Sequence, residues 1–200
     1  VSRTDRIGDV LLSTPAIKAL REAYPNAYIS VLVSPYAKDV VHGNPHVDEV
    51  LVYDKEKKHK GWFSSWQFSR VLKKKDFDLA VILHPTNRMH IVTFFAAIKQ
   101  RVGYDRKLGF LLTKRLAHTK HLGEKHELDY SLDLLRPIGI LPKDRALYMP
   151  LRQESEIWAD AVLRKNGIKS HDKILAINPG ASCPSKVWPA DRFAHVADVM

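Results

Sequence analysis

Short apolar runs alternate along the chain with longer segments in which apolar residues recur every three or four positions. The runs are typical of β-strands, and the segments between them are typical of amphipathic helices. Strands are predicted at 28–33, 50–53, 78–83, 101–104 and 174–177. Helices are predicted at 9–23, 35–42 (a short helix or turn), 61–72, 90–98, 125–136, 155–166 and from 191 onward. Strands that alternate with helices indicate an α/β fold with a mostly parallel sheet.

Three features interrupt this alternation. Pro15 falls inside the first helical pattern, so it either kinks that helix or lies in the first turn of a helix capped by Ser13. Residues 107–123 are predicted to be irregular and basic, and residues 142–150, which prolines bound, are predicted to be an extended linker. The break near residue 150 indicates a second α/β unit that has only begun.

Positive charge is concentrated in one segment. The 200 residues include 32 Lys or Arg and 22 Asp or Glu, which gives a net charge of +10. Residues 55–75 hold eight of the basic residues and one acidic residue, so they carry +7. Such a segment favours an anionic partner: nucleic acid, an acidic membrane surface or a phosphorylated substrate. Trp62 and Trp66 are four positions apart and share a helix face, which suits a membrane interface unless both pack inward.

The cysteine content and the hydropathy of the chain bear on the cellular compartment of the protein. Cys183 is the only cysteine, which excludes an intrachain disulfide and fits a reducing compartment. No apolar run approaches the roughly 20 residues of a membrane span, and the charged start of the chain does not fit a secretory signal. The chain has no initiating methionine and ends at Met200 inside a helical pattern. We therefore expect a fragment of a longer protein.

The loop from Gly180 to Pro189 combines small residues with one lysine, between the predicted strand at 174–177 and a helix start. Backbone N–H groups and a helix dipole that converge there suit an anion such as phosphate. Lys186 would add a point charge to a diphosphate, and Ser182 a hydroxyl. The alternative is a loop with a solvated lysine, in which Trp188 and Pro189 only pack.

A second candidate for chemistry is Asp9, which follows Gly8 at the start of the first helix. Open α/β sheets bind ligands outside the carboxyl ends of their strands, where this residue is predicted to lie. Asp9 is either a helix cap or a general base that mainly positions a hydroxyl, because a helix start lowers the basicity of a carboxylate.

Other types of site have little support in the sequence. A single glycine near Asp9 does not make a dinucleotide-binding or Walker A loop. The histidines do not form a metal-binding signature; those considered are His84, His90, His118, His121 and His126. No G-x-S-x-G motif is present to support a hydrolase triad.

Four stretches together resemble the bacterial heptosyltransferases of glycosyltransferase family 9, the enzymes of the lipopolysaccharide inner core that use ADP-heptose. They are Arg3–Ile17 (RTDRIGDVLLSTPAI), Phe94–Tyr104 (FFAAIKQRVGY), His126–Tyr130 (HELDY) and Pro179–Pro189 (PGAS, then K-x-WP). The resemblance covers nearly the whole chain. It implies a GT-B fold, with residues 1–150 as an N-terminal Rossmann-like acceptor-binding domain and residues 151–200 as the beginning of a C-terminal nucleotide-sugar-binding domain.

The resemblance also implies an inverting transfer of a heptose from ADP-heptose, with no metal and no cofactor. Asp9 falls on the catalytic base of the family. Donor diphosphate binding falls on the second-domain loop, at Gly180, Ala181, Ser182 and Lys186. Binding of the anionic lipid-A–Kdo acceptor falls on the basic residues Arg3, Arg6, Lys58 and Lys60. The protein would act in the cytoplasm, in peripheral contact with the inner face of the inner membrane.

Two departures and two alternatives accompany this interpretation. The chain lacks most of the first strand and most of the second domain of the family, so we do not expect the 200 residues alone to complete a turnover. One alternative is another nucleotide-sugar glycosyltransferase of the GT-B fold. The other is a basic nucleic-acid-binding domain that uses residues 55–75, but no nucleic-acid-binding motif supports it, and nucleic acid is not expected as a partner.

Overall fold

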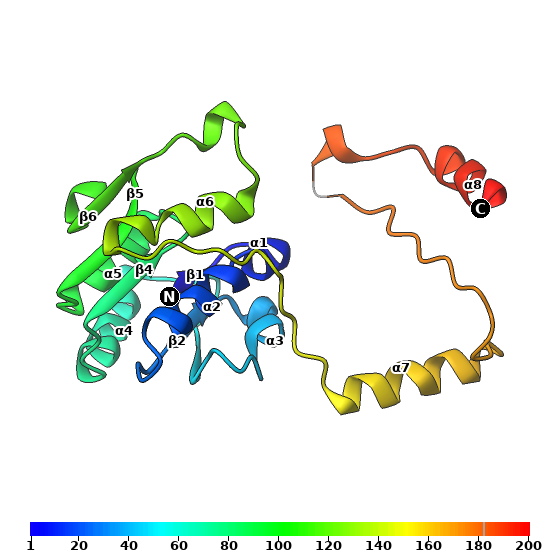
Figure 1. Cartoon of the computed structure of the whole chain (residues 1–200), viewed down its shortest axis with the longest axis horizontal. Helices are drawn as coiled ribbons and strands as arrows, with labels where there is room; N and C mark the ends of the chain where they lie inside the picture. Colours follow the sequence, from blue (N-terminus) through cyan, green and yellow to red (C-terminus); the bar gives the residue numbers. More distant parts are fainter. Residues whose placement is uncertain (182) are drawn as a thin grey trace. The chain divides into compact units, whose positions relative to one another are not determined.

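The computed structural model describes residues 1–181 and 183–200. The chain divides into two compact units, Val1–Pro150 and Leu151–Met200 (Figure 1). Each unit is described by itself. No helix in the described part of the chain is long and apolar enough to cross a membrane.

Six parallel strands form the sheet of the first unit, in the order β3-β2-β1-β4-β5-β6. The strands are β1 (Ser2–Arg3), β2 (Ser30–Val33), β3 (Glu49–Val52), β4 (Leu79–Ile82), β5 (Gln100–Asp105) and β6 (Lys114–Ala117). The predicted α/β fold with a parallel sheet is confirmed. β4 is almost wholly buried, as expected of a continuous apolar run covered on both faces.

Helices cover both faces of this sheet (Figure 1). They are α1 (Ile7–Leu11), α2 (Thr14–Ala23), α3 (Lys38–Val41), α4 (Trp62–Lys74), α5 (Asn87–Phe95) and α6 (Glu127–Asp133), with single 3₁₀ turns η1 (Pro35–Ala37), η2 (Gly109–Leu111), η3 (Lys120–Leu122) and η4 (Arg136–Ile138). Alternate strand residues point to opposite faces. Val31 and Val81 pack with α2, α3 and α6 in one core, whereas Leu32 and Ile82 pack with α4 and α5 in the other.

The structure decides between the two predictions for Pro15. The helical pattern over 9–23 forms two helices, α1 and α2, and Pro15 lies in the first turn of α2 after Ser13 at the N-cap position. The Ser13 hydroxyl does not cap α2; it donates a hydrogen bond of 2.7 Å to the Asp9 carbonyl instead. Pro15 therefore marks the start of a helix, where its missing N–H costs nothing.

The prediction for residues 107–123 is wrong in part. Lys114–Ala117 forms β6, the edge strand, in register with β5 through Val102 and Lys114. The segment has few of the β-branched or aromatic residues that favour strands, and lysine and arginine on an edge strand protect it from pairing with another chain. Hydrogen bonding to β5 therefore forms this strand, and local composition did not predict it.

Residues 142–150 are extended, as predicted, but they are fixed to the first unit. The backbone N–H of Tyr148 donates to the Thr14 hydroxyl at 3.1 Å, and Arg145 pairs with Asp129 at 2.7 Å. Lys18 of α2 also forms an ion pair with Asp144. This segment therefore belongs to the packed part of the unit.

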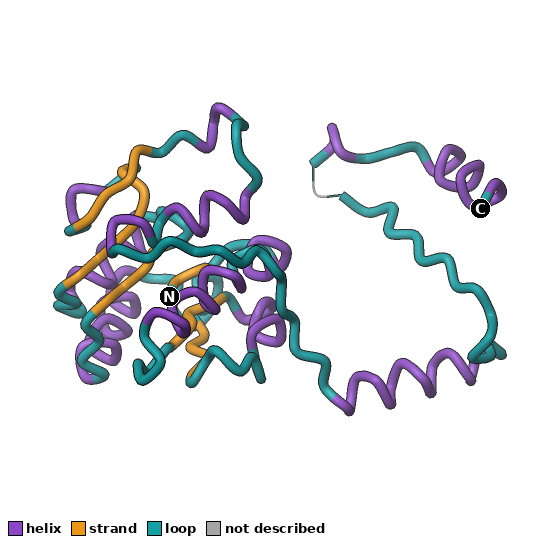
Figure 2. The backbone as a smooth tube through the Cα atoms, in the orientation of Figure 1, coloured by secondary structure: helices purple, strands orange, loops and turns teal. Residues whose placement is uncertain are grey.

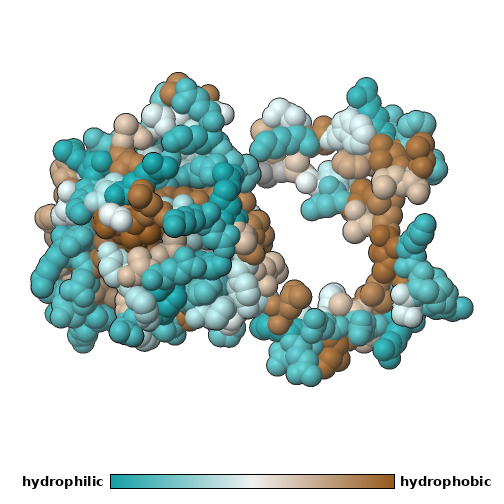
Figure 3. Space-filling model, viewed as in Figure 1, coloured by the Kyte–Doolittle hydropathy of each residue, from teal (hydrophilic) through white to brown (hydrophobic). Residues whose placement is uncertain are grey.

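The second unit contains α7 (Gln153–Lys165), a 3₁₀ turn η5 (Pro184–Lys186) and α8 (Ala190–Val199). Gly167 follows α7 with a φ of +76°, as predicted for a glycine that ends a helix. The strand predicted at 174–177 is wrong: these residues are loop (Figure 2). A strand needs a hydrogen-bonded neighbour, and the described residues of this unit contain none, so the apolar side chains of the segment are exposed (Figure 3).

Candidate functional site

Polar side chains converge where the strand order of the sheet reverses. From β1 the chain moves outward through β2 to β3, and then returns to place β4 on the other side of β1. In open parallel sheets this switch point, outside the carboxyl ends of the strands, is where ligands bind. Arg3 ends β1, Asp5 follows it, and His84 follows β4. The carboxyl ends of β1 and β4 therefore mark the candidate site.

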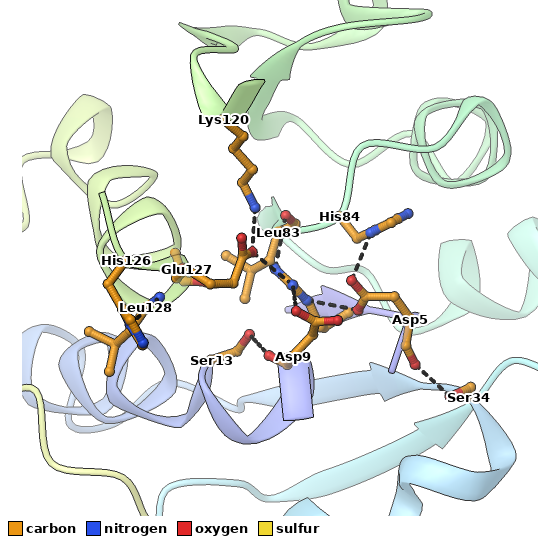
Figure 4. Close-up of polar contacts among 12 residues, drawn as sticks. Asp5, Asp9, Ser13, Ser34, Leu83, His84, Lys120, His126, Glu127 and Leu128 are labelled. Carbon is orange, nitrogen blue, oxygen red and sulfur yellow. Dashed lines mark hydrogen bonds and ion pairs between the residues drawn. The ribbon is translucent and has the colours of Figure 1, made fainter. Parts of the chain in front are cut away.

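Arg3 lies at the centre of the site. Its side chain is 3% exposed, and its guanidinium contacts three carboxylates (Figure 4). Nε donates to Oδ1 of Asp5 at 2.8 Å, and Nη2 lies 3.0 Å from Oδ1 of Asp9 and 2.9 Å from Oε1 of Glu127. Nη1 donates to the Leu83 carbonyl at 3.3 Å. We call Arg3, Asp5, Asp9 and Glu127 the Arg3 cluster; one buried cation fixes its three carboxylates.

Asp9 lies in the first turn of α1 and has a partly exposed side chain. Arg3 holds one of its carboxylate oxygens, and the described residues provide no partner for the other. A partly exposed carboxylate held in this way can accept a hydrogen bond from a ligand hydroxyl. Asp9 does not act as the N-cap of α1, because Arg6 occupies that position.

Asp5 and His84 form a hydrogen-bonded pair beside Asp9. Nδ1 of His84 lies 2.8 Å from Oδ2 of Asp5, and the His84 ring is partly exposed. Burial works to raise the pKa of Asp5, but the hydrogen bond with His84 and the charge of Arg3 outweigh it and lower that pKa. Asp5 is therefore a carboxylate at neutral pH, and it holds the His84 ring through Nδ1.

Glu127 closes the other side of the cluster from the first turn of α6. It accepts hydrogen bonds from Arg3 and from Lys120. Burial works to raise the pKa of Glu127, and Lys120 and Arg3 together lower it. The neighbouring His126 is the N-cap of α6, where its ring nitrogen accepts from the Leu128 N–H at 3.3 Å. This histidine therefore starts the helix that places Glu127.

The predicted acceptor-binding residues lie at the same edge of the sheet but differ in exposure. Arg6, Lys58 and Lys60 are exposed, whereas Arg3 is buried and directs its guanidinium at the cluster. The turn that carries the two lysines follows β3. Arg88 anchors it by donating to the carbonyls of His59 at 2.7 Å and Lys60 at 2.9 Å.

The ring of His59 fixes the same turn from inside. It stacks on Tyr53 with ring centroids 4.7 Å apart, and its Nδ1 accepts from the Asp54 N–H at 3.0 Å. Burial lowers the pKa of His59, and the charge of Lys58 lowers it further. A buried neutral ring therefore keeps the two flanking lysines in fixed positions on the surface.

The predicted donor loop belongs to the second unit. Gly180, Ala181 and Lys186 are exposed, and Ser182 lies outside the described residues. Lys186 ends η5, and α8 begins four residues later at Ala190, so this lysine is not in the first turn of that helix. The Gly180 N–H points to the side chain of Asn178 at 3.3 Å. The structure brings none of these residues together with Asp9 in one unit.

Sequence reasoning missed Asp5, Glu127 and Lys120, and it considered His84 only as a metal ligand. A usable signal was present for His84, because it follows the predicted strand at 78–83. Asp5 follows β1, which is the neighbour of that strand in the sheet. Glu127 and Lys120 gave no such signal. Glu127 reaches Arg3 from a helix more than a hundred residues away in the chain, and Lys120 pairs with Glu127 from a nearby turn.

Known proteins resemble this chain in sequence and in fold. The model of glycosyltransferase family 9 (heptosyltransferase) matches residues 65–200. Lipopolysaccharide heptosyltransferase 3 of Escherichia coli K12 is 23% identical over 96% of the chain and 57% of its own length. A crystal structure of a family 9 glycosyltransferase from Veillonella parvula superposes with a TM-score of 0.88 and 27% identity, over 99% of this chain and 58% of that one.

A further solved relative has a bound ligand. The structure of an E. coli heptosyltransferase with ADP-2-deoxy-2-fluoro heptose matches with a TM-score of 0.62 and 18% identity, over 84% of this chain and 66% of that one. At this identity it supports the fold alone. The chain spans a little over half the length of the curated relatives it matches. The family model covers more than half of the chain, and the chain belongs to glycosyltransferase family 9, the heptosyltransferase family.

Proposed function

We propose that the protein is an inverting glycosyltransferase that moves a heptose from ADP-heptose to the lipopolysaccharide inner core. One observation carries the proposal: in a family 9 chain, Arg3 holds one carboxylate oxygen of Asp9 at the switch point of the sheet and leaves the other oxygen available to a ligand. The relatives support this donor and acceptor, since they include lipopolysaccharide heptosyltransferases and a heptosyltransferase structure with an ADP-heptose analogue.

In the proposed reaction Asp9 is the base. The open oxygen of Asp9 accepts the proton of an acceptor hydroxyl while the hydroxyl oxygen bonds to the anomeric carbon of the donor. The bond from that carbon to the ADP oxygen breaks on the opposite side, and ADP leaves with the electron pair, which inverts the configuration. Arg3 holds Asp9 in position. The guanidinium nitrogens of Arg3 already contact protein groups, so we assign acceptor binding to the exposed cations Arg6, Lys58 and Lys60.

The second unit supplies donor binding in this proposal. Gly180, Ala181 and Ser182 offer backbone N–H groups or a hydroxyl to the diphosphate, and Lys186 offers a positive charge. Charge develops on the diphosphate as the bond to the sugar breaks, so fixed positive groups near it stabilise the transition state more than the ground state. The family resemblance implies that no metal ion and no cofactor take part, which leaves this role to the protein.

The first unit supplies acceptor binding. The exposed cations at the carboxyl edge of its sheet suit the phosphates and carboxylates of a lipid-A–Kdo acceptor. Such an acceptor is embedded in a bilayer, so the enzyme would work in the cytoplasm against the inner face of the inner membrane.

Substitution of Asp9 tests the proposal. In a chain extended to the full length of its family 9 relatives, Asp9→Asn should retain ADP-heptose binding, measured by calorimetry, and reduce transfer to lipid-A–Kdo, measured by mass spectrometry, by at least a hundredfold. Asp160→Asn, an exposed change in α7, serves as the matched control. Full transfer by Asp9→Asn would remove Asp9 from the mechanism. Tighter binding of another nucleotide sugar would favour a different donor, and preferential binding of random RNA would favour the nucleic-acid alternative.

A further inference from the structure

Helix α4 presents an amphiphilic face that the proposed chemistry does not use. Its buried positions follow a helical period, at Ser65, Phe68, Ser69 and Leu72, and they pack on the sheet. The exposed face carries aromatic residues in its first turns and cations in its last. Together with Phe95 of the adjacent α5, this face forms what we call the α4 surface: Trp62, Phe63, Trp66, Arg70, Lys73, Lys74 and Phe95.

The aromatic part of this surface is unusually exposed. Phe63 is 69% exposed and Trp62 is 58% exposed, although large apolar side chains at such positions gain free energy by burial. Phe63 stacks on Trp66 with ring centroids 5.8 Å apart, so the rings form a patch rather than isolated contacts. A contiguous apolar patch on a helix marks a surface that contacts something else.

The cations lie against the same rings. Trp66 and Phe95 form the aromatic sides of an open groove between α4 and α5, and the basic side chains Arg70, Lys73 and Lys74 line it with Ser69. The Arg70 guanidinium lies 5.1 Å from the Trp66 ring centroid, and Arg88 lies 5.4 Å from that of Trp62. The groove lining includes no acidic residue. A ligand of this surface must therefore be anionic and also have an apolar part.

The α4 surface begins beside the candidate site. The chain leaves β3 at the carboxyl edge of the sheet, passes through the turn with Lys58 and Lys60, and enters α4 at Trp62. A helix that follows a parallel strand runs back toward the opposite edge, so the aromatic residues lie near the site and Lys73 and Lys74 lie far from it. A flat partner along α4 would therefore pass next to the residues proposed to bind the acceptor.

We infer that the α4 surface docks the protein on an anionic phospholipid membrane. Tryptophan and phenylalanine enter the interfacial region of a bilayer, and lysine and arginine beside them attract anionic headgroups, as on interfacial amphipathic helices. Only the purpose of this docking, which is to bring a lipid-linked acceptor to the site, rests on the proposed function. A second copy of the chain fits the surface poorly, because the groove lining holds three cations and no acidic residue to pair with them.

Vesicle flotation tests the inference with the whole chain. Vesicles of phosphatidylethanolamine and phosphatidylglycerol should bind it, and vesicles of phosphatidylcholine alone should bind it far more weakly. The triple variant Arg70→Gln, Lys73→Gln, Lys74→Gln should lose about a hundredfold in affinity for the anionic vesicles, roughly fivefold for each cation. A matched triple on the other face of the sheet, Lys38→Gln, Arg136→Gln, Lys143→Gln, should lose much less, although it removes the same charge.

A pair of phenylalanine variants tests the aromatic part. Phe63→Ser should weaken binding to the anionic vesicles severalfold, whereas Phe110→Ser should not, although Phe110 is equally exposed at 68%. Equal losses in the two triple variants, or in the two phenylalanine variants, would overturn the inference. It would also be overturned if the α4 cations governed RNA binding or self-association while anionic vesicles remained unbound. Asp9→Asn should leave vesicle binding intact, so failure here is distinguishable from failure of the proposed reaction.

Discussion

Replacement of Arg3 by methionine is the most direct test of the Arg3 cluster. Methionine keeps most of the length of the side chain and removes its charge. The variant leaves Asp5 and Asp9 without their buried cation, whereas Glu127 keeps Lys120. The carboxylates then repel one another at the centre of the fold, beneath the carboxyl ends of β1 and β4.

The size of the effect follows from burial. Removal of one partner from a buried ion pair costs about 3–5 kcal/mol. The side chains of Asp5, Asp9 and Glu127 are 16%, 28% and 28% exposed, so water compensates in part and we expect the lower end of that range, about 3 kcal/mol. For a chain of this size, a loss of about 3 kcal/mol lowers Tm by roughly 6–12 °C.

The loss should also depend on pH, with a definite sign. Asp5 and Glu127 have pKa values below their usual ones in the folded protein, and Arg3 contributes to both shifts. The stability that comes from these shifts is present above the unfolded-state pKa values, near 4, and is lost as the pH falls through the folded-state values. The difference between Arg3→Met and the unaltered chain should therefore be largest at pH 7 and smaller at pH 4.

Urea unfolding followed by circular dichroism at both pH values measures this difference. Arg115→Met is the control, since the Arg115 guanidinium lies 3.6 Å from Asp105 and both side chains are half exposed; its cost should stay below about 1 kcal/mol. The reasoning is refuted if Arg3→Met is as stable as this control. It is also refuted if the loss is equal at pH 7 and pH 4, because a packing defect would not titrate.

Three other predictions follow from single contacts. Lys186→Ala should weaken ADP-heptose binding by about tenfold or more in calorimetry, the usual cost of a charged hydrogen bond, and unchanged affinity would end its assigned role. His84→Phe should raise the pKa of Asp5 in a carboxyl NMR titration, because the hydrogen bond and the charge of His84 both lower it; an unshifted Asp5 would show that the pair does not form. Leu72→Ala should cost about 2–5 kcal/mol in urea unfolding because Leu72 lies on the buried face of α4, whereas Val71→Ala, at the exposed neighbouring position, should cost under 1 kcal/mol.

The parts of the fold that sequence predicted well are those with a strong local signal. The apolar run at 78–83 gave β4, and Gly167 marked the end of α7 by its need for a positive φ. Two strand predictions were wrong for the same reason: β6 was not predicted as a strand, and the segment at 174–177 was. A strand depends on a hydrogen-bonded neighbour as well as on its own residues: Lys114–Ala117 has that neighbour in β5, and 174–177 has none in the described unit.

The candidate site divides in the same way. A strand end followed by a helix start was enough to predict the position of Asp9. The role of Arg3 could not be predicted, because its contacts join residues up to 124 positions apart, and only the fold shows that they meet. Side chains that follow neighbouring strands, such as Asp5 and His84, lie between these cases: their meeting is predictable once the order of the strands is known.

The contact between Arg3 and Asp9 also bears on how a carboxylate could serve as the base in the proposed transfer. A carboxylate is a far weaker base than an alkoxide, so it cannot remove a proton from a free alcohol to any useful extent. It does not need to do so. As the hydroxyl oxygen bonds to the anomeric carbon it gains positive charge, and its proton becomes strongly acidic, so a weak base suffices if it is already hydrogen-bonded to that hydroxyl. Arg3 would then contribute to catalysis by fixing the position of Asp9, and a variant that loosens Asp9 should lower transfer even where the carboxylate remains ionised.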